Sequence, residues 1–423
     1  MRKIKNKSNW EIIRKLFNDV HLWVGLIAGI FVFVICLSGT IYVYNTEIRE
    51  FASSHLHEVT PESKKIDIEQ LSEIVKVESN AKVTGFTIPA DESKSYQINT
   101  RQEGDNSRGG VTYYINPYTG AILGNSKEES KVATFMGSMF SLHRWLMLDK
   151  VETPIIGDLP NRTLGSYISG TMTILFTIGL LTGMVIWFPR KIKRWRQGLT
   201  IKFNSNWKRI NHDIHNSLSL YSFIFLLIMG ITGPQWSFEW YRTGLRKALG
   251  TYQEAPSRGP AGGNSKADAP KEAAENASQA TITLLPISTY LETVNASFPY
   301  EGDIRVTIPT EDEDIISISK YKAGFFAPAA ANQIKLKVQD ASVQETMIFK
   351  DKPFNERVSS SIKALHVGDV YGQFSKLIYF ITCLIATSLP VTGTLIWINK
   401  LKKKKKGKGK VSRKPALAMR ESI

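Results

Sequence analysis

Cysteine is scarce in this chain, with two residues among 423. Two thiols exclude a disulfide framework and a zinc site built from four thiolates. No Gly-x-Gly-x-x-Gly fingerprint opens a strand–helix unit, so the sequence predicts no built-in flavin or nicotinamide domain. Acidic residues are also few, because 38 Asp and Glu oppose 54 Lys and Arg, for a formal charge of +16. Such an excess suggests a nucleic-acid partner unless the positions of the charges explain it.

Charged residues are absent from three long apolar runs and nearly absent from a fourth. The runs cover 20–44, 167–188, 217–238 and 374–398, and the last contains only Lys376. A helix needs about 20 apolar residues to cross the hydrocarbon of a bilayer. We therefore predict an α-helical membrane protein with four transmembrane helices in contact with lipid. The first run is longer than the apolar part of a signal peptide and precedes no small-x-small cleavage site, which predicts a retained anchor.

The positive charge is concentrated in three short segments outside these runs. Residues 1–19, 189–216 and 399–423 hold 25 Lys and Arg against four acidic residues. Short loops rich in Lys and Arg stay in the cytoplasm. We predict a multi-pass membrane protein with both termini in the cytoplasm. The charge then indicates topology, and no nucleic-acid partner is expected.

Two long segments, 45–166 and 239–373, are predicted on the outer side, and each is long enough for a small folded domain. Helical periodicity occurs at 66–78 and 286–299. Strand patterns occur at 94–101, 109–124, 302–309, 314–321, 333–340 and 345–351. We predict two small α+β units, each with one helix over an antiparallel sheet. A stretch at 255–280 that is rich in Gly, Ala, Pro and Ser is predicted to be a flexible insert.

The chain repeats itself in two halves. When Asp19-x-His21 is aligned with Asp213-x-His215, Gly39 falls opposite Gly233 without a gap. A second pair of matching segments aligns Gly183 with Gly393 and Trp187 with Trp397, and a Leu-His dipeptide ends at His143 in one half and at His366 in the other. Each half is thus a span, an outer unit, a Leu-His dipeptide and a second span, which predicts tandem halves from a duplication.

Four histidines occupy the duplicated positions at the predicted membrane boundaries. For a single histidine, hydration at the interface would be an adequate explanation, but ionisable groups at membrane depth usually have a function. Neutral imidazole binds haem iron, zinc and copper, and zinc sites usually recruit Cys or carboxylates, which the spans lack apart from Cys36 and Cys383. Two histidines on facing helices are able to hold one haem iron between them.

We therefore predict two haem b groups bound by histidine pairs. His21 and His215 would hold one at the cytoplasmic side, and His143 and His366 would hold the other at the outer side. His212 lies one helical turn before His215 and is an alternative to it. Because His143 lies far in sequence from its span, 131–148 is predicted to return to the membrane as an interfacial or re-entrant helix.

Neighbouring residues suit such cofactors but have ordinary explanations as well. Arg144 is a possible contact for a haem propionate or simply an interfacial cation. Six glycines in the spans would give a flat macrocycle room between helices or would serve plain helix packing. They are Gly25, Gly29, Gly39, Gly183, Gly233 and Gly393.

The sequence resembles the PepSY-associated transmembrane family, also known as iron-regulated membrane proteins. The resemblance rests on HLWVGLIAG from His21, YYINPYTGAILG from Tyr113, LHRW from Leu142, NHDIHNSL from Asn211 and TGMVIW from Thr182. It implies two extracytoplasmic PepSY-like domains and an inner-membrane haem protein of the siderophore-reductase kind. Such a reductase passes electrons from the cytoplasmic side to a ferric siderophore or another outer acceptor and releases Fe(II). A separate cytoplasmic or quinol donor would supply the electrons.

Three other functions compete with this one. A non-enzymatic envelope sensor, regulator or peptidase-binding protein would use PepSY domains but would not need the histidines. A permease usually has broken helices and polar residues at mid-membrane, whereas the helix-breaking candidates Pro234 and Pro390 lie near span ends. Nucleic-acid binding is disfavoured by the topology. The sequence identifies neither the acceptor nor a catalytic residue.

Overall fold

The computed structural model describes residues 9–104, 110–189, 192–253, 284–310 and 313–411. Four long helices form a bundle: α1 (Asn9–Tyr42), α6 (Asn161–Trp187), α7 (Trp207–Thr232) and α12 (Gly372–Val411). The short turn η3 (Gly233–Trp236) extends α7. All four are long and apolar enough to cross a membrane. The predicted insert at 255–280 lies outside the described residues.

Many small polar side chains of the bundle are hydrogen-bonded within their own helix. The hydroxyl of Thr40 donates to the Cys36 carbonyl, and those of Thr173 and Ser222 likewise donate to the carbonyl four residues earlier. Such bonds let small polar side chains lie in an apolar environment without an unpaired donor. Between 22% and 28% of each apolar window is buried inside the protein. The other residues of each window keep some exposed surface, which suggests contact with lipid.

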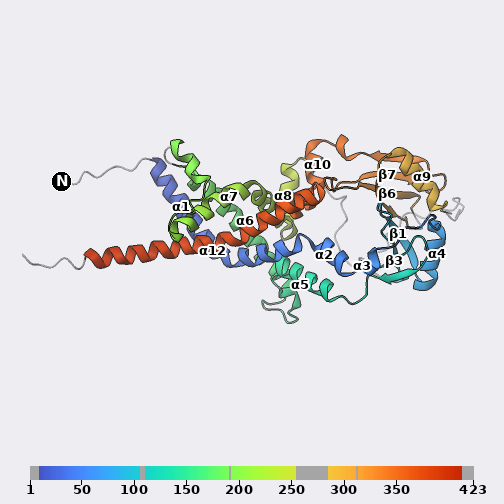
Figure 1. Ribbon diagram of the computed structural model, residues 1–423, viewed down its shortest axis with the longest axis horizontal. Helices are drawn as coiled ribbons and strands as arrows, with labels where there is room; N and C mark the ends of the chain where they lie inside the picture. Colours follow the sequence, from blue (N-terminus) through green and yellow to red (C-terminus); the bar gives the residue numbers. More distant parts are fainter. Residues whose placement is uncertain (1–8, 105–109, 190–191, 254–283, 311–312, 412–423) are drawn as a thin grey trace, which may run out of the picture.

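A single antiparallel sheet lies at the end of the bundle opposite to the start of α1 and the end of α12 (Figure 1). Its eight strands follow the order β4-β3-β2-β1-β5-β6-β7-β8. The strands are β1 (Lys82–Ile88), β2 (Tyr96–Arg101), β3 (Val111–Ile115), β4 (Ile122–Asn125), β5 (Gly302–Thr307), β6 (Ile315–Lys322), β7 (Asn332–Lys337) and β8 (Val343–Met347). Each outer segment contributes four consecutive strands as a meander.

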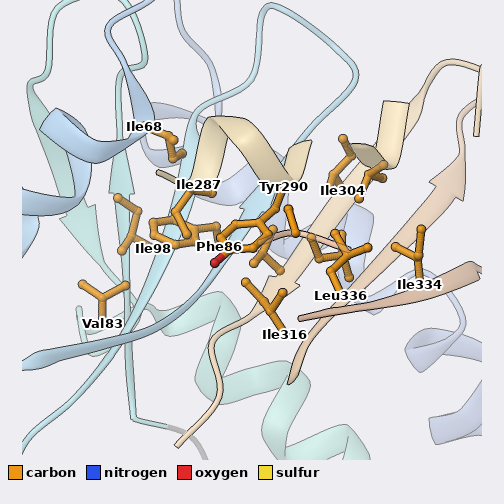
Figure 2. Packing of buried hydrophobic residues seen from close by; sticks show 14 of the residues in the cluster. Ile68, Val83, Phe86, Ile98, Ile287, Tyr290, Ile304, Ile316, Ile334 and Leu336 are labelled. Atoms are coloured by element: carbon orange, nitrogen blue, oxygen red, sulfur yellow. The ribbon is translucent and has the colours of Figure 1, made fainter. Parts of the chain in front are cut away.

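This shared sheet corrects the prediction of two separate outer units. The two meanders join where β1 pairs with β5, with Phe86 opposite Val306 and Ile88 opposite Ile304. The helices α4 (Ile68–Ser79) and α9 (Ile287–Ser297) pack against one continuous core. In Figure 2 the α9 residue Tyr290 lies among strand residues from both segments. Pairing removes an exposed edge from each meander, and unpaired sheet edges are a liability.

Strand β1 escaped prediction because its buried positions do not alternate regularly. Its pairing with β2 shifts register between Val83 and Gly85. A Cβ atom on Gly85 would lie 2.5 Å from the Val306 carbonyl oxygen. Gly85 therefore permits the close approach of β5 at the joint between the two segments, and any larger residue would push β5 away.

The hairpin turns of the two meanders have the same backbone bonds. In the Asn-Pro-Tyr-Thr-Gly turn, Gly120 N–H donates to Asn116 O, and Gly120 has a φ of +74°. In the other turn, Ala341 N–H donates to Lys337 O, and Ala341 has a φ of +54°. The second turn thus repeats the first without its motif, and its alanine is held in the left-handed region that favours glycine.

Short helices connect the bundle to the sheet. They are α2 (Asn45–Ala52), α3 (Ser54–His57), α5 (Lys131–Trp145), α8 (Glu239–Ala248), α10 (Phe354–Ser360) and α11 (Ile362–Val367). A partly buried ion pair ties α2 to the first turn of α12, with Lys376 Nζ 2.6 Å from Glu47 Oε1. Gln373 donates to the same carboxylate oxygen. The start of α12 is thereby attached to the segment that follows α1.

Candidate functional site

Two histidines face each other at the end of the bundle remote from the sheet. His21 comes from α1 and His215 from α7. Their ring centroids are 6.3 Å apart, and the ring planes are inclined by 76°. The two residues occupy equivalent positions in the aligned halves of the sequence.

A second pair of histidines lies at the sheet end of the bundle. His143 is in the last turn of α5, and His366 is in α11. Their ring centroids are also 6.3 Å apart, with an inclination of 59°. Helix α5 lies within 131–148, and the C-cap residue Leu146 that follows it has a left-handed φ of +54°, which ends the helix. The structure thus brings together the same two pairs that pseudosymmetry predicts.

Each of the four rings is held through its Nδ1 atom. His21 Nδ1 lies 2.9 Å from the Gly179 carbonyl oxygen, and His143 Nδ1 lies 2.8 Å from that of Ile35. A carbonyl only accepts hydrogen bonds, so each Nδ1 carries the hydrogen and each Nε2 keeps a free lone pair. This is the tautomer in which Nε2 is able to bind a metal.

Threonine hydroxyls do the same for the other two histidines. His215 Nδ1 lies 2.8 Å from Thr392 Oγ1, and His366 Nδ1 lies 3.0 Å from Thr232 Oγ1. Each threonine hydroxyl already donates to a carbonyl of its own helix, Thr392 to Ser388 O and Thr232 to Ile228 O. The hydroxyl oxygens therefore accept from Nδ1, which again leaves both Nε2 atoms free.

Four of the six predicted glycines contact the histidine rings. A Cβ atom on Gly39 would lie 2.9 Å from the His143 ring, and one on Gly183 would lie 3.0 Å from the His21 ring. A Cβ atom on Gly233 would lie 3.3 Å from the His366 ring, and one on Gly393 would lie 3.3 Å from the His215 ring. These four glycines make room for the imidazoles, and the prediction that they also make room for a macrocycle stays a prediction. Gly25 and Gly29 line the cavity described next, as Gly183 and Gly393 also do.

A cavity of about 310 Å³ adjoins the first pair and receives side chains from all four long helices. His21 and His215 lie in its wall, together with apolar residues such as Val32, Phe176 and Phe223. His212 also borders the cavity, but its side chain is 54% exposed, and its Nδ1 lies 3.6 Å from Asp213 Oδ1. His215, rather than the alternative His212, therefore faces His21.

The second pair is shielded from water. Burial, followed by the neighbouring His143, lowers the pKa of His366 to about 3. The imidazole is therefore neutral at ordinary pH. The ring of Trp236 lies edge-on to it, with centroids 5.0 Å apart. Arg144 donates to the Trp236 carbonyl at 2.8 Å, which places its guanidinium next to this pair.

Among the described residues, no three of His, Cys, Asp and Glu come together as a metal-ion site would require. Zinc in proteins usually takes three or four such ligands. Two opposed imidazoles without a third such ligand among the described residues suit a cofactor that brings further ligands of its own. The donor set therefore fits haem better than a bare ion.

Sequence reasoning missed the residues that orient the rings. A signal for them exists, because each ring-contacting glycine follows a hydroxyl residue. The four dipeptides are Ser38-Gly39, Thr182-Gly183, Thr232-Gly233 and Thr392-Gly393. Thr182 Oγ1 lies 3.4 Å from His21 Nδ1, and Thr232 and Thr392 make the bonds described above. The dipeptide is not specific, because Ser169-Gly170 of α6 lies against Ser237 and Phe238 instead of a histidine ring.

Comparison with known proteins identifies one family. The model of the PepSY-associated TM region matches residues 19–400, which is nearly the whole chain. No curated protein matches the sequence.

Proposed function

The chain belongs to the PepSY-associated TM family, and from that premise we propose that this membrane protein is a di-haem oxidoreductase. It moves electrons from the cytoplasmic side of the bacterial inner membrane to an acceptor on the other side. The favoured acceptor is a ferric siderophore, from which Fe(II) is released. The same proposal includes the tandem halves and two extracytoplasmic PepSY-like units within the shared sheet.

The distance between the rings of each pair carries this proposal. A metal bonded to one nitrogen of each ring at about 2 Å would hold the two ring centroids roughly 6 Å apart. Both pairs have a centroid distance of 6.3 Å. Interfacial histidines without a common ligand have no reason to repeat this separation at both ends of the bundle. The anchored Nδ1 atoms add support, since metal-binding histidines usually donate their other ring nitrogen to a protein acceptor.

The positions of the pairs along α1 fit electron transfer across a membrane. His21 belongs to α1, and Gly39 of the same helix contacts the His143 ring. These two positions are 18 residue steps apart, which corresponds to about 27 Å of helix. The hydrocarbon core of a bilayer is about 30 Å thick. One pair therefore belongs to each side of the membrane.

The protein residues have defined tasks in this function. His21, His215, His143 and His366 would hold two haem b groups, which supply one-electron transfer when bound. With each haem held by two histidines, the acceptor would take its electron from a separate position on the outer side. Each ferric ion takes one electron and becomes Fe(II). A quinol donor on the cytoplasmic side supplies two electrons for two ferric ions and releases two protons.

A reduced-minus-oxidised spectrum of purified protein, with pyridine haemochrome quantification, tests the proposal. We expect two b-type haems per chain. Replacing His21 or His215 by Ala should remove one haem, and replacing His143 or His366 should remove the other. His212→Ala is the matched control and should keep both. A haem-replete preparation without Soret absorption, or four single variants that all keep two haems, would overturn the proposal.

A further inference from the structure

A polar pocket of about 410 Å³ lies beside the second histidine pair, at the sheet end of the bundle. Four elements form it: the end of α5, the first turn of α6, the turn η3 and the first turn of α8. Its wall includes Arg144, Arg162, Arg242, Gln235, Ser166 and Trp236. The pocket is separate from the cavity that adjoins His21 and His215. None of the ring-holding contacts described above uses Arg162 or Arg242.

The charge of this pocket is positive. Three guanidinium groups line it, and the one carboxylate among its lining residues is that of Glu239, which pairs with Arg242 at 2.7 Å. Arg162 lies over the Trp145 ring, 4.1 Å from its centroid. The Trp236 carbonyl takes one donor of Arg144, and a guanidinium has five N–H donors. The pocket is therefore rich in hydrogen-bond donors for an anion.

A helix N-terminus and several aromatic side chains strengthen the preference of the pocket for an anion. Arg162 lies in the first turn of α6, a helix of 27 residues. The N-terminal end of a helix carries partial positive charge. Aromatic rings from Trp145, Trp236 and Phe238 form part of the wall. A guanidinium stacked on an aromatic ring, beside further aromatic side chains, suits a bulky organic anion better than a small hydrated ion.

The pocket also adjoins the proposed electron exit. Trp236 belongs to the pocket wall, and its ring lies 5.0 Å from that of His366. Arg144 directly follows His143 in the chain. A molecule in the pocket is thus separated from the outer histidine pair by a single aromatic residue. A surface site for a structural lipid would have no need of this proximity.

We propose that this pocket, formed by Arg144, Arg162, Arg242 and Trp236, binds the electron acceptor, and that the acceptor is a ferric chelate of net negative charge. The inference rests on the proposed function and adds to it the docking position and the charge class of the substrate. The bound Fe(III) takes one electron from the reduced protein and leaves as Fe(II). The quinol-class donor on the cytoplasmic side supplies that electron.

Binding is tested with redox-inert gallium chelates, so that the result does not depend on electron transfer. The full-length protein in phosphatidylcholine nanodiscs is titrated by calorimetry with anionic Ga(III)–EDTA and with neutral Ga(III) tris(acetohydroxamate). We expect the anionic chelate to bind and the neutral one to bind at least about tenfold more weakly. Added salt should weaken the binding of the anion.

Charge variants locate the site. Arg162→Gln and Arg242→Gln should each weaken binding of the anionic chelate by about tenfold. Glu239→Gln removes the opposing carboxylate and should tighten binding. Arg246→Gln is the matched control, because Arg246 lies one turn further along α8, is exposed and does not line the pocket. Arg144 is left intact because it follows His143. Equal affinities in all four variants would overturn the proposal.

Two further arms separate the alternatives. If phosphatidylglycerol in the nanodisc abolishes chelate binding, the pocket belongs to a lipid headgroup and the proposal is wrong. Haem content is measured on every sample. Chelate binding without haem would overturn the electron-transfer function and leave the pocket assignment standing. Haem without chelate binding would overturn the pocket assignment and leave the electron-transfer function standing. Retention of haem and of the thermal transition shows that each variant is folded.

Discussion

At the scale of single residues, the contact between a helix glycine and an imidazole edge recurs four times in the bundle. Each glycine lets a ring approach the helix so closely that an added methyl group would crowd it. The contact is tightest at Gly39, where a Cβ atom would lie 2.9 Å from both Cε1 and Nδ1 of His143. Because real Cβ atoms do not approach ring atoms so closely, this histidine must move if Gly39 is replaced.

We therefore predict that Gly39→Ala displaces His143 and removes the outer haem while the inner one is retained. The reason is steric, since the protein interior yields little to an added methyl group. The measurement is haem content per chain by pyridine haemochrome. Gly137→Ala is the control, because Gly137 is in the same helix as His143 and has open space around its Cβ direction. An unchanged haem content in Gly39→Ala would contradict the assignment of this glycine.

A second prediction at this scale concerns the orientation of His215. Thr392→Val keeps the size of the side chain but removes the acceptor for Nδ1–H of His215. Loss of such an outer partner typically lowers metal affinity by about 10- to 100-fold. We expect haem to pass from this variant to apomyoglobin faster than from the unmodified protein. Thr387→Val should behave normally, because the Thr387 hydroxyl donates to Cys383 O of its own helix. Equal transfer rates for the two variants would refute the orienting role.

At the scale of elements, the bundle and the sheet meet through short connecting helices, of which α2 is attached most directly. Glu47 of α2 is hydrogen-bonded to Lys376 and Gln373 of α12. Burial alone would raise the pKa of Glu47, but these hydrogen bonds outweigh it and hold the pKa below its ordinary value. The side chain of Lys376 is 11% exposed and that of Glu47 is 32% exposed. Water therefore screens the pair only in part.

We predict that Lys376→Met lowers the free energy of unfolding by about 1–2 kcal/mol, less than for a fully buried pair because Glu47 is partly exposed. The depressed pKa of Glu47 means that the pair stabilises the protein above the ordinary carboxylate range and loses this effect as the pH falls. Denaturation of the full-length protein in detergent should show a smaller loss of stability on acidification in the variant. Lys335→Met breaks an exposed pair and should cost less. Equal costs for the two variants would contradict this account.

At the scale of the whole molecule, both described chain ends lie at one end of the bundle and the sheet lies at the other (Figure 1). This arrangement agrees with the even number of long helices. The basic segments at the end remote from the sheet predict that this end faces the cytoplasm. The sheet then stands outside, on the same side as His143, His366 and the arginine pocket. Electron transfer toward an outer acceptor requires this orientation.

Cysteine labelling tests the orientation. In a background of Cys36→Ala and Cys383→Ala, we expect Ser297→Cys in α9 to react with a membrane-impermeant maleimide once the outer surface of the inner membrane is accessible. Lys208→Cys at the start of α7 should react only after the membrane is opened. Both positions are exposed, so access depends on the side of the membrane. The opposite labelling pattern would contradict the proposed orientation and, with it, the proposed direction of electron transfer.

The amino-acid sequence by itself determined the four long helices and the repeated histidine positions, because apolar length and residue identity are local properties of the chain. The charge asymmetry and the family can likewise be recognised from the sequence. Even so, β1 was missed, because the bulge at Gly85 disturbs its alternation, and the orienting threonines were not recognised among many ordinary helix hydroxyls.

Only the tertiary structure decided which groups meet. It selected His215 over His212, assigned Gly39 and Gly183 to imidazole rings, and joined two outer segments into one sheet through β1 and β5. It also gathered Arg144, Arg162 and Arg242 from three helices around one pocket. These contacts link residues distant in the chain. Whether such residues meet is decided by the packing of whole elements, and that packing leaves no short pattern in the sequence.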